Sequence, residues 1–321
     1  MSKAYTTEVY RQARDRFLAL KDPGQLADLL KISLHELHSL ASASHYHIMR
    51  MRNARGKVRV LFMPDHKLKA VQRRLNHWLQ AVYYLEKPSC VYGFVRCPDD
   101  VAPKLDIITH AQNHVGRNFV VGADVFRFFP SIKAHMVRNV FLSAPFHFDP
   151  QLASALALLC VSRNWLPTGS PVSPVISNLV FLGPDRDLQL LADRYGYAYT
   201  RYADDLTFSG HSRPDEAFRQ QLEEILLQHG FILHRRKYRV QSRTTRQMVT
   251  GLVVNDKVSL PREYRKRLRA IQHNLVQYGP ELEAKTFFNR FHISENDLIR
   301  FQYIVRGRQR WVDRVRMTSL P

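Results

Sequence analysis

Cysteine is scarce in this sequence, whose 321 residues contain only Cys90, Cys97 and Cys160. An odd number of cysteines without a Cys-x-x-Cys pair indicates neither a disulfide framework nor a cysteine zinc site. The N-terminus has no apolar signal core, and no apolar run approaches the roughly 20 residues that a membrane-spanning helix needs. We therefore expect a cytoplasmic protein that makes no use of a membrane.

Acidic residues are also few, because 28 Asp and Glu stand against 48 Lys and Arg, which gives a formal net charge of +20. The excess is concentrated in residues 231–321, which hold 20 Lys and Arg against 7 Asp and Glu. An isolated basic run is usually a solvated surface. Concentration in one segment favours a nucleic-acid partner instead.

The rest of the composition, 45% hydrophobic, is sufficient for a sizeable core. Residues 1–45 and 68–79 have helical spacing, as do 151–161, 172–182, 215–229 and the chain from Arg262 onward. The sequence also predicts two hairpins and three further strands. These are hairpins within residues 49–62 and 197–210, and strands at 118–126, 231–233 and 248–254.

Three acids stand where the predicted strands end. Asp124 closes a strand that is otherwise apolar, and Asp204 and Asp205 occupy the tip of the second hairpin. An Asp-Asp pair in a turn is usually only turn chemistry. Nucleotidyl transfer, however, needs two divalent cations about 4 Å apart, bridged by carboxylates. The three acids are therefore candidate catalytic residues and ligands for two Mg²⁺ ions, with Mn²⁺ as the substitute.

Two further segments decide between these interpretations. Residues 124–132 read Asp-Val-Phe-Arg-Phe-Phe-Pro-Ser-Ile, residues 166–174 read Leu-Pro-Thr-Gly-Ser-Pro-Val-Ser-Pro, and residues 202–205 read Tyr-Ala-Asp-Asp. In order and spacing this set resembles the three central palm motifs of reverse transcriptases. The Val-Thr-Gly segment at 249–251 and the His-Ala-Gln-Asn-His segment at 110–114 are similar to segments of bacterial retron reverse transcriptases.

The resemblance covers the chain from about residue 55 to the C-terminal region. It implies an α+β fold of the right-hand polymerase type, with fingers, a palm built on an antiparallel sheet, and a helical thumb. We expect an N-terminal helical extension at 1–45, fingers and palm at 46–260, and a thumb at 261–321. The palm itself would comprise about 118–135 and 166–260.

The resemblance also assigns residues that bind substrate. Lys57 and Arg59 would grip the incoming triphosphate, Phe129 would lie under its sugar and exclude a 2′-hydroxyl, and Lys237 would protonate pyrophosphate. Alternatively, Lys57 and Arg59 belong to an ordinary basic hairpin, and Phe129 is a core aromatic. Arg235 or Arg236 could make the phosphate contacts in place of Lys237. On the helix that begins at Arg262, apolar residues share one face. Its basic rim, represented by Arg265, Lys266 and Arg269, would follow the template-primer duplex.

Two positions depart from the family pattern. His110 stands where relatives have Asn, and Thr168 stands where Gln is common. His110 and His114 could form an i, i+4 metal pair, but no third ligand lies nearby in the sequence. We expect His114 to have an RNA-contacting or a packing role.

The sequence therefore predicts an RNA-directed DNA polymerase that uses deoxynucleoside triphosphates. By resemblance it would copy part of a cognate non-coding RNA into a branched RNA–DNA hybrid, known as msDNA. It would act in antiphage defence with an effector protein encoded nearby. The alternatives are a reverse transcriptase of another bacterial lineage, either group II intron-like or a stand-alone defence enzyme, and an RNA-binding protein with a vestigial polymerase site.

Overall fold

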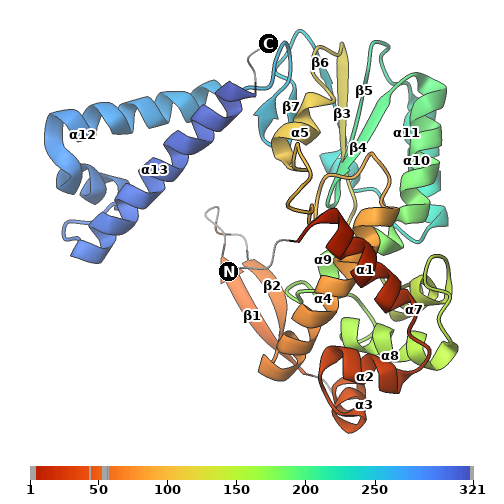
Figure 1. The fold of residues 1–321 in the computed structure, drawn as a ribbon. Coiled ribbons are helices and arrows are strands. Elements are labelled where there is room, and N and C mark those ends of the chain that lie inside the picture. The colour runs from red at the N-terminus through yellow and green to blue at the C-terminus, as the bar shows by residue number, and fades with distance from the viewer. Residues whose placement is uncertain (1–4, 43–44, 53–55, 57, 319–321) are drawn as a thin grey trace.

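The computed structural model describes residues 5–42, 45–52, 56 and 58–318. Its body consists of helices packed around a small sheet, and a helical arm projects from one side (Figure 1). At the base of that arm the last helix of the chain returns to the body.

The central sheet has four strands in the order β4-β5-β3-β6, all antiparallel to their neighbours. These strands are β3 (Phe119–Asp124), β4 (Ala198–Tyr202), β5 (Asp205–Gly210) and β6 (Arg239–Ser242). Because side chains alternate between the faces of a strand, Val121 and Ala123 enter the main core while Val120 enters a second one. Asp124 therefore lies on the same face of the sheet as Val120 and the second core.

Helices cover the other face of the sheet. The main core gathers apolar side chains from the sheet and from the helices that cover it, including Leu206 and Phe208 of β5 and Phe218 of α11. The helices that contribute include α4 (His66–Glu86), α7 (Ala134–Leu142), α8 (Pro150–Cys160), α9 (Ser173–Val180), α10 (Leu182–Tyr195) and α11 (Glu216–Gln228). On the opposite face lies α5 (Ile107–Gln112), which packs with Val120 in the second core.

The N-terminal segment is packed into the same core as the rest of the body. It forms α1 (Thr7–Leu18), α2 (Pro23–Leu30) and α3 (Leu34–Ser42), which lie beside α4 (Figure 1). Phe17, Leu26 and Leu37 are buried in the main core. Next comes a hairpin of β1 (Tyr46–Arg52) and β2 (Val58–Pro64), which is exposed along most of its length.

The arm is made of α12 (Arg262–Phe288) and α13 (Glu295–Met317). Gly279, at φ 79°, and Pro280 interrupt α12, because proline cannot continue the hydrogen-bond ladder of a helix. A separate small core with Ile271, Ala284 and Phe301 at its centre joins the outer parts of the two helices. The base of the arm instead joins the second core through Leu268, Val312 and Val315.

The structure confirms the α+β right-hand fold and corrects three details of the expected elements. Residues 231–233 form no strand but only an isolated bridge between Leu233 and Val125. The expected strand at 248–254 is divided into β7 (Met248–Val249) and β8 (Leu252–Val253), because Thr250 and Gly251 turn the chain with positive φ angles. The edge strand β6 was not predicted. Of the helices that the structure describes, none is long and apolar enough to cross a membrane.

Candidate active site

Three aspartates from two neighbouring strands meet at one end of the central sheet. Asp124 is the last residue of β3 and Asp205 the first of β5, and the antiparallel register places them directly opposite each other. Asp204 lies in the preceding turn, where its carbonyl oxygen accepts a hydrogen bond from the amide of Val125 at 3.3 Å. The fold therefore assembles the three acids that the sequence singled out.

The carboxylates are close enough to disfavour one another's charge. Desolvation raises the pKa of Asp205 to about 6, and the charges of Asp204 and Asp124 add to the increase. The pKa of Asp204 is also raised, first by desolvation and then by Asp124. Such mutual repulsion is relieved when a cation binds between the groups. The three carboxylates at this end of the sheet therefore favour the binding of a cation.

The same acids supply the donor atoms that a divalent metal ion prefers. Mg²⁺ and Mn²⁺ favour hard carboxylate oxygens, completed by water and substrate phosphate. Among the described residues, no three His, Cys, Asp or Glu side chains form a ready-made cage for a metal ion. A site that uses few protein ligands and shares the ion with its substrate does not require such a cage. The donor set of Asp124, Asp204 and Asp205 therefore fits divalent ions.

Lys237 lies beside these acids. Its ammonium nitrogen Nζ is 2.6 Å from Oδ2 of Asp124 and still half exposed. Arg235, an alternative to Lys237 for a phosphate contact, instead donates to Glu223 at 2.7 Å on the surface. The structure thus places Lys237 at the carboxylates and directs Arg235 away from them.

A cleft of about 590 Å³ opens in front of the acids. Asp124, Tyr202 and Asp205 line one side, and the β7–β8 turn lines another. Arg236, Lys237 and Arg239 also line it. An added Cβ on Gly122 would lie 3.1 Å from Nε of Arg239, so this arginine rests on the sheet at a glycine. The cleft therefore combines acids with cations suited to phosphate.

Phe129 lies in the short helix α6 (Phe128–Ser131), five residues after Asp124. Its ring is partly buried and contacts those of Phe128, at 5.6 Å between centroids, and Phe94, at 5.9 Å. Phe128 is a buried core residue, whereas Phe126 is 41% exposed. Phe129 is thus only partly buried, and the rings of Phe94 and Phe128 pack against it. Its role as a gate stays a prediction.

The β1–β2 hairpin carries the basic residues expected to bind the triphosphate. Arg59 is exposed on β2, and its charge lowers the otherwise raised pKa of Asp204. The expected contact of Arg59 with the triphosphate stays a prediction. Lys57 lies outside the described residues, so its expected role stays a prediction.

His114 is completely buried, with both ring nitrogens engaged. Nδ1 is 2.7 Å from the hydroxyl of Ser209, and Nε2 is 2.6 Å from that of Thr200. No ring atom is available to RNA in this conformation. The packing role, which the sequence left open beside RNA contact, is the one that this burial supports.

His110 is also buried, and it bridges two motifs of the sequence. Its Nδ1 is 3.3 Å from the hydroxyl of Thr250, and its ring packs 5.7 Å from that of Tyr202. Nε2 has no hydrogen-bond partner among the described residues. Among the described residues, no third His, Cys, Asp or Glu joins His110 and His114 in a possible metal site, so nothing supports the zinc alternative.

A buried ion pair supports the turn that carries Asp204. Arg201 is fully buried and donates to Asp185 through Nε at 2.8 Å and Nη2 at 2.6 Å. Its Nη1 donates to the carbonyl oxygen of Ala203 at 3.0 Å, and Ala203 has a φ of 60°. A buried charge is tolerated only when paired and hydrogen-bonded. The bonds that satisfy Arg201 therefore include one that holds the backbone at Ala203, just before Asp204.

Gly93 completes this support. A Cβ at this position would lie 2.3 Å from the backbone nitrogen of Ala203, which no real contact allows. The carbonyl oxygen of Gly93 accepts a hydrogen bond from Asn178 at 3.0 Å, and Asn178 in turn accepts one from Arg201. The turn is therefore held from beneath by residues that the sequence did not indicate.

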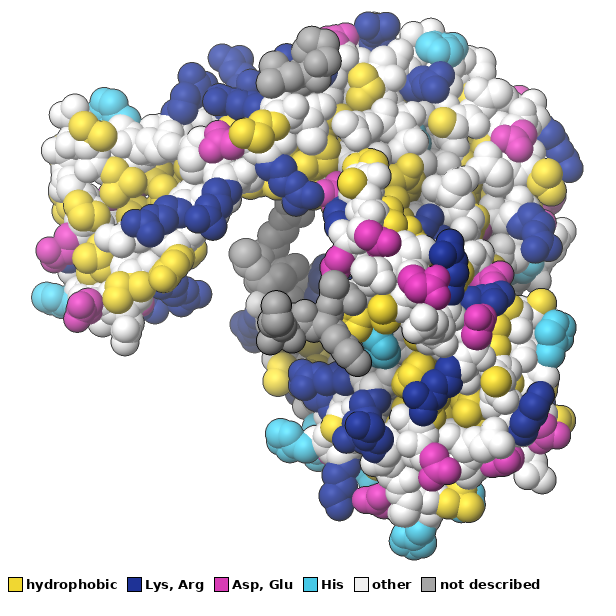
Figure 2. Space-filling view, in the orientation of Figure 1, with side chains coloured by type: hydrophobic (Ala, Val, Ile, Leu, Met, Phe, Trp, Pro, Cys, Tyr) yellow, Lys and Arg dark blue, Asp and Glu magenta, His cyan; other side chains and the backbone are white. Residues whose placement is uncertain are grey.

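Basic side chains gather along the arm (Figure 2). Arg265, Lys266 and Arg269 are all exposed, and a groove of about 270 Å³ includes Arg265, Arg269 and Arg316 of α13. The arginines of α13 were not predicted as individual contact residues. They recur along the helix at positions 300, 306, 308, 310, 314 and 316.

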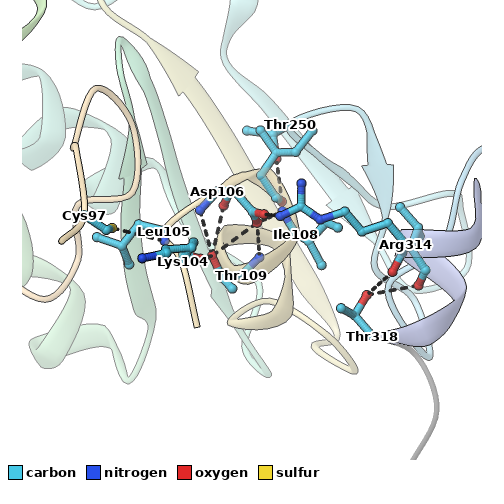
Figure 3. A network of polar contacts seen from close by, with 11 residues as sticks. Cys97, Lys104, Leu105, Asp106, Ile108, Thr109, Thr250, Arg314 and Thr318 are labelled. Carbon is cyan, nitrogen blue, oxygen red and sulfur yellow. Dashed lines mark hydrogen bonds and ion pairs between the residues drawn. The ribbon is translucent and has the colours of Figure 1, made fainter. Parts of the chain in front are cut away.

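The base of the arm is tied to the body by one carboxylate. Oδ1 of Asp106 caps α5 by accepting the amides of Ile108 at 2.7 Å and Thr109 at 2.9 Å, while Oδ2 accepts Nη2 of Arg314 (Figure 3). The first residue of α5, Ile107, accepts a further hydrogen bond: its carbonyl oxygen lies 3.3 Å from the hydroxyl of Thr250 in the β7–β8 turn. The arm, α5 and the β7–β8 turn therefore meet at one polar network.

An antiparallel sheet with three acids at adjoining strand ends, a basic cleft beside them and a projecting helical arm is the arrangement expected of the right-hand polymerase fold. Residues 50–254 match the family described as reverse transcriptase (RNA-dependent DNA polymerase). The chain belongs to this family, and within it groups with the retron reverse transcriptases of bacteria.

Three relatives illustrate the grouping. The retron Mx65 reverse transcriptase of Myxococcus xanthus is 38% identical over 71% of this chain and 56% of its own length. The retron Ec86 reverse transcriptase of Escherichia coli is 30% identical, covering 84% of each chain. The retron Mx162 reverse transcriptase of Myxococcus xanthus is 32% identical over 81% of this chain and 60% of its own. The chain thus spans little more than half of two of these relatives.

A solved structure of telomerase from Candida albicans with the TWJ fragment of telomeric RNA aligns with 84% of this chain and 60% of its own. The TM-score is 0.45 and the identity 11%.

Proposed function

We propose that this chain is an RNA-directed DNA polymerase of retron type that joins deoxynucleotides at Asp124, Asp204 and Asp205. The observation that supports this most strongly is the meeting of these acids at one end of the sheet, with Lys237 2.6 Å from Asp124. A vestigial site would have no reason to keep three carboxylates that repel one another.

Two divalent ions, Mg²⁺ or Mn²⁺, would be held by the three acids, and when bound they lower the pKa of the attacking hydroxyl and stabilise the leaving pyrophosphate. Around them, Lys237 would supply a proton to the leaving group. Lys57 and Arg59 would hold the triphosphate, and Phe129 would support the sugar. Arg265, Lys266 and Arg269 would contact the backbone of the template-primer duplex.

The product and partners form the further part of this proposal. The enzyme would begin at the 2′-hydroxyl of a guanosine in its cognate structured RNA and copy part of that RNA into a branched RNA–DNA hybrid. The hybrid would act with an effector protein encoded nearby in defence against phage. Support comes from the retron relatives and from the Val-Thr-Gly segment at 249–251, whose turn borders the cleft.

Primer extension tests the polymerase. The purified chain, given an RNA template, a DNA primer, deoxynucleotides and Mg²⁺, should extend the primer. Asp204→Asn/Asp205→Asn should remove this activity. A matched control is Asp256→Asn, which alters an acid whose side chain is 81% exposed in a surface ion pair. An inactive wild type that still binds RNA would support the RNA-binding alternative instead.

The nucleic acid that accompanies the protein tests the retron type. The chain should be purified from its host, and the bound material treated with RNase and DNase separately. A branched species sensitive to both enzymes is the expected result. Recovery of linear RNA alone would contradict the retron proposal and leave a reverse transcriptase of another bacterial lineage. A plaque assay with the intact locus and with the double Asp variant tests the role in defence.

A further inference from the structure

Thr168 joins two parts of the molecule that are otherwise in limited contact. It lies in the loop at 166–171, before α9, and this loop runs along the outer edge of β2. The carbonyl oxygen of Thr168 accepts a hydrogen bond from the amide of Phe62 at 3.2 Å. Its hydroxyl donates to the carbonyl oxygen of Val60 at 3.0 Å. Thr168 therefore pairs with the free edge of β2, much as a residue of a third strand would.

The loop is a fixed base for this contact. Ser170 donates to Oε1 of Gln72 at 2.8 Å, and Nε2 of this buried glutamine donates to the hydroxyl of Tyr46 and to the carbonyl oxygen of Leu159, both at 2.8 Å. Ser173 donates to the carbonyl oxygen of Pro167 at 2.6 Å. The loop is thus bonded near both ends to buried groups, which restrain the backbone around Thr168.

The neighbouring glycine allows the close approach. Gly169 has a φ of 140°, which L-residues rarely adopt, and a Cβ there would lie 2.9 Å from both the carbonyl oxygen of Phe62 and Sδ of Met63. The loop backbone therefore sits against β2 at a distance that only glycine permits. The contact at Thr168 is part of this fitted surface.

The hairpin has few other supports. All of β1 after Tyr46 and the first three residues of β2 are exposed, so packing holds the hairpin mainly at its base. There the ring of Phe62 meets that of Trp165 at 6.0 Å between centroids. Val60 lies one residue from Arg59, whose charge acts on Asp204. The hydroxyl of Thr168 therefore makes its bond next to the arginine that is expected to hold the triphosphate.

We propose that Thr168 is a positioning residue that fixes the β1–β2 hairpin over the palm and thereby sets the affinity for the incoming nucleotide. This inference rests on the proposed function, because it concerns the nucleotide site of that polymerase. The hydroxyl of Thr168 is engaged by the carbonyl oxygen of Val60, so its effect on the nucleotide would pass through the hairpin.

The test compares Thr168→Val, which keeps the shape and removes the hydroxyl, with Thr168→Ser, which keeps the hydroxyl. With a poly(rA) template, an oligo(dT) primer and dTTP, the loss of one hydrogen bond should raise KM for Thr168→Val about fivefold, with a much smaller change in kcat. Thr168→Ser should restore KM to near the wild-type value. Equal KM values for wild type and Thr168→Val would overturn the proposal.

Amide hydrogen exchange gives a readout that does not need activity. Thr168→Val should exchange faster than wild type at residues 58–64 and unchanged in α4, whereas Thr168→Ser should match wild type. Unchanged exchange in Thr168→Val would also overturn the proposal, as would faster exchange with an unaltered KM. If the wild type itself does not extend primers, the proposed function fails, and exchange at 58–64 still decides whether Thr168 holds the hairpin.

Discussion

Nζ of Lys237 lies 2.6 Å from Oδ2 of Asp124, which makes a lysine the direct neighbour of a candidate metal ligand. The two residues are 113 positions apart in the sequence, and a short 3₁₀ turn, Arg235–Lys237, brings them together. The amide of His234 strengthens the junction by donating to the carbonyl oxygen of Asp124 at 2.7 Å. Lys237 is therefore positioned both to balance the carboxylate and to reach a leaving phosphate.

Replacing Lys237 separates these two tasks. Lys237→Met removes charge and proton donor, and we expect kcat for primer extension to fall about a hundredfold or more. Lys237→Arg keeps the charge but cannot donate a proton at neutral pH, so it should leave kcat low. Arg235→Met is the control, because Arg235 pairs with Glu223 on the surface. Full activity of Lys237→Arg would show that charge alone is needed.

The raised pKa of Asp205 predicts how stability depends on pH without divalent metal. Its folded pKa is about 6 and its ordinary value 3.8, so between these values the folded state binds more protons. The stability associated with protonated Asp205 is therefore lost as pH rises through about 6. Asp205→Asn should have a higher melting temperature than wild type at pH 7.5 in EDTA.

The difference between Asp205→Asn and wild type should shrink as the buffer is brought toward pH 4. Mg²⁺ should raise the melting temperature of wild type more than that of the variant, because the ion binds the charged carboxylates. Differential scanning fluorimetry across pH, with and without Mg²⁺, measures both effects. A variant that is less stable than wild type at pH 7.5 in EDTA would contradict the predicted repulsion.

Phe129→Ala should admit ribonucleotides. Removing the ring frees space under the sugar, so the preference for dTTP over UTP, expressed as a ratio of kcat/KM values, should fall at least tenfold, a difference of about 1.4 kcal/mol. Phe126→Ala is the matched control, since its ring is exposed and packs on His234. An unchanged ratio in Phe129→Ala would remove the gate assignment.

Two glycine substitutions should have opposite effects. In Gly93→Ala the new methyl group collides with the backbone nitrogen of Ala203, so the free energy of unfolding should fall by about 1–3 kcal/mol and kcat should drop as Asp204 shifts. In Gly307→Ala, on an exposed face of α13 with no atom within 4 Å of the new Cβ, the same change should stabilise by about 0.5–1 kcal/mol. Urea unfolding and primer extension measure both variants. Normal stability in Gly93→Ala would show that the turn can relax.

Local patterns in the sequence predicted much of the fold. A continuous apolar run predicted the strand that carries Asp124, and a strand–turn–strand pattern predicted the hairpin that carries Asp204 and Asp205. The edge strand β6 was missed because its sequence, Arg-Val-Gln-Ser, is short and largely polar, and it pairs with only one neighbour. Such a strand is defined by its partner rather than by its own residues.

The residues that support the site were harder to predict than the acids. Asp185 lies in α10 and Arg201 in β4, and nothing local shows that they pair at 0% exposure. Thr168 was recognised as a departure from the family, but its bond to Val60 joins residues 108 positions apart. His114 resembled a surface contact because its motif was read without knowing which face of the sheet it covers. In each case a long-range contact decides the role.

The shared carboxylate of Asp106 also orders the assembly of the protein. Its partner Arg314 lies 208 positions later, so the bond closes a loop that includes the whole sheet. Contacts between such distant residues form late in folding, since the intervening chain must first be ordered. We therefore expect the body to fold first and the arm to dock last, so that the surface for a duplex is completed only after the acids are in place.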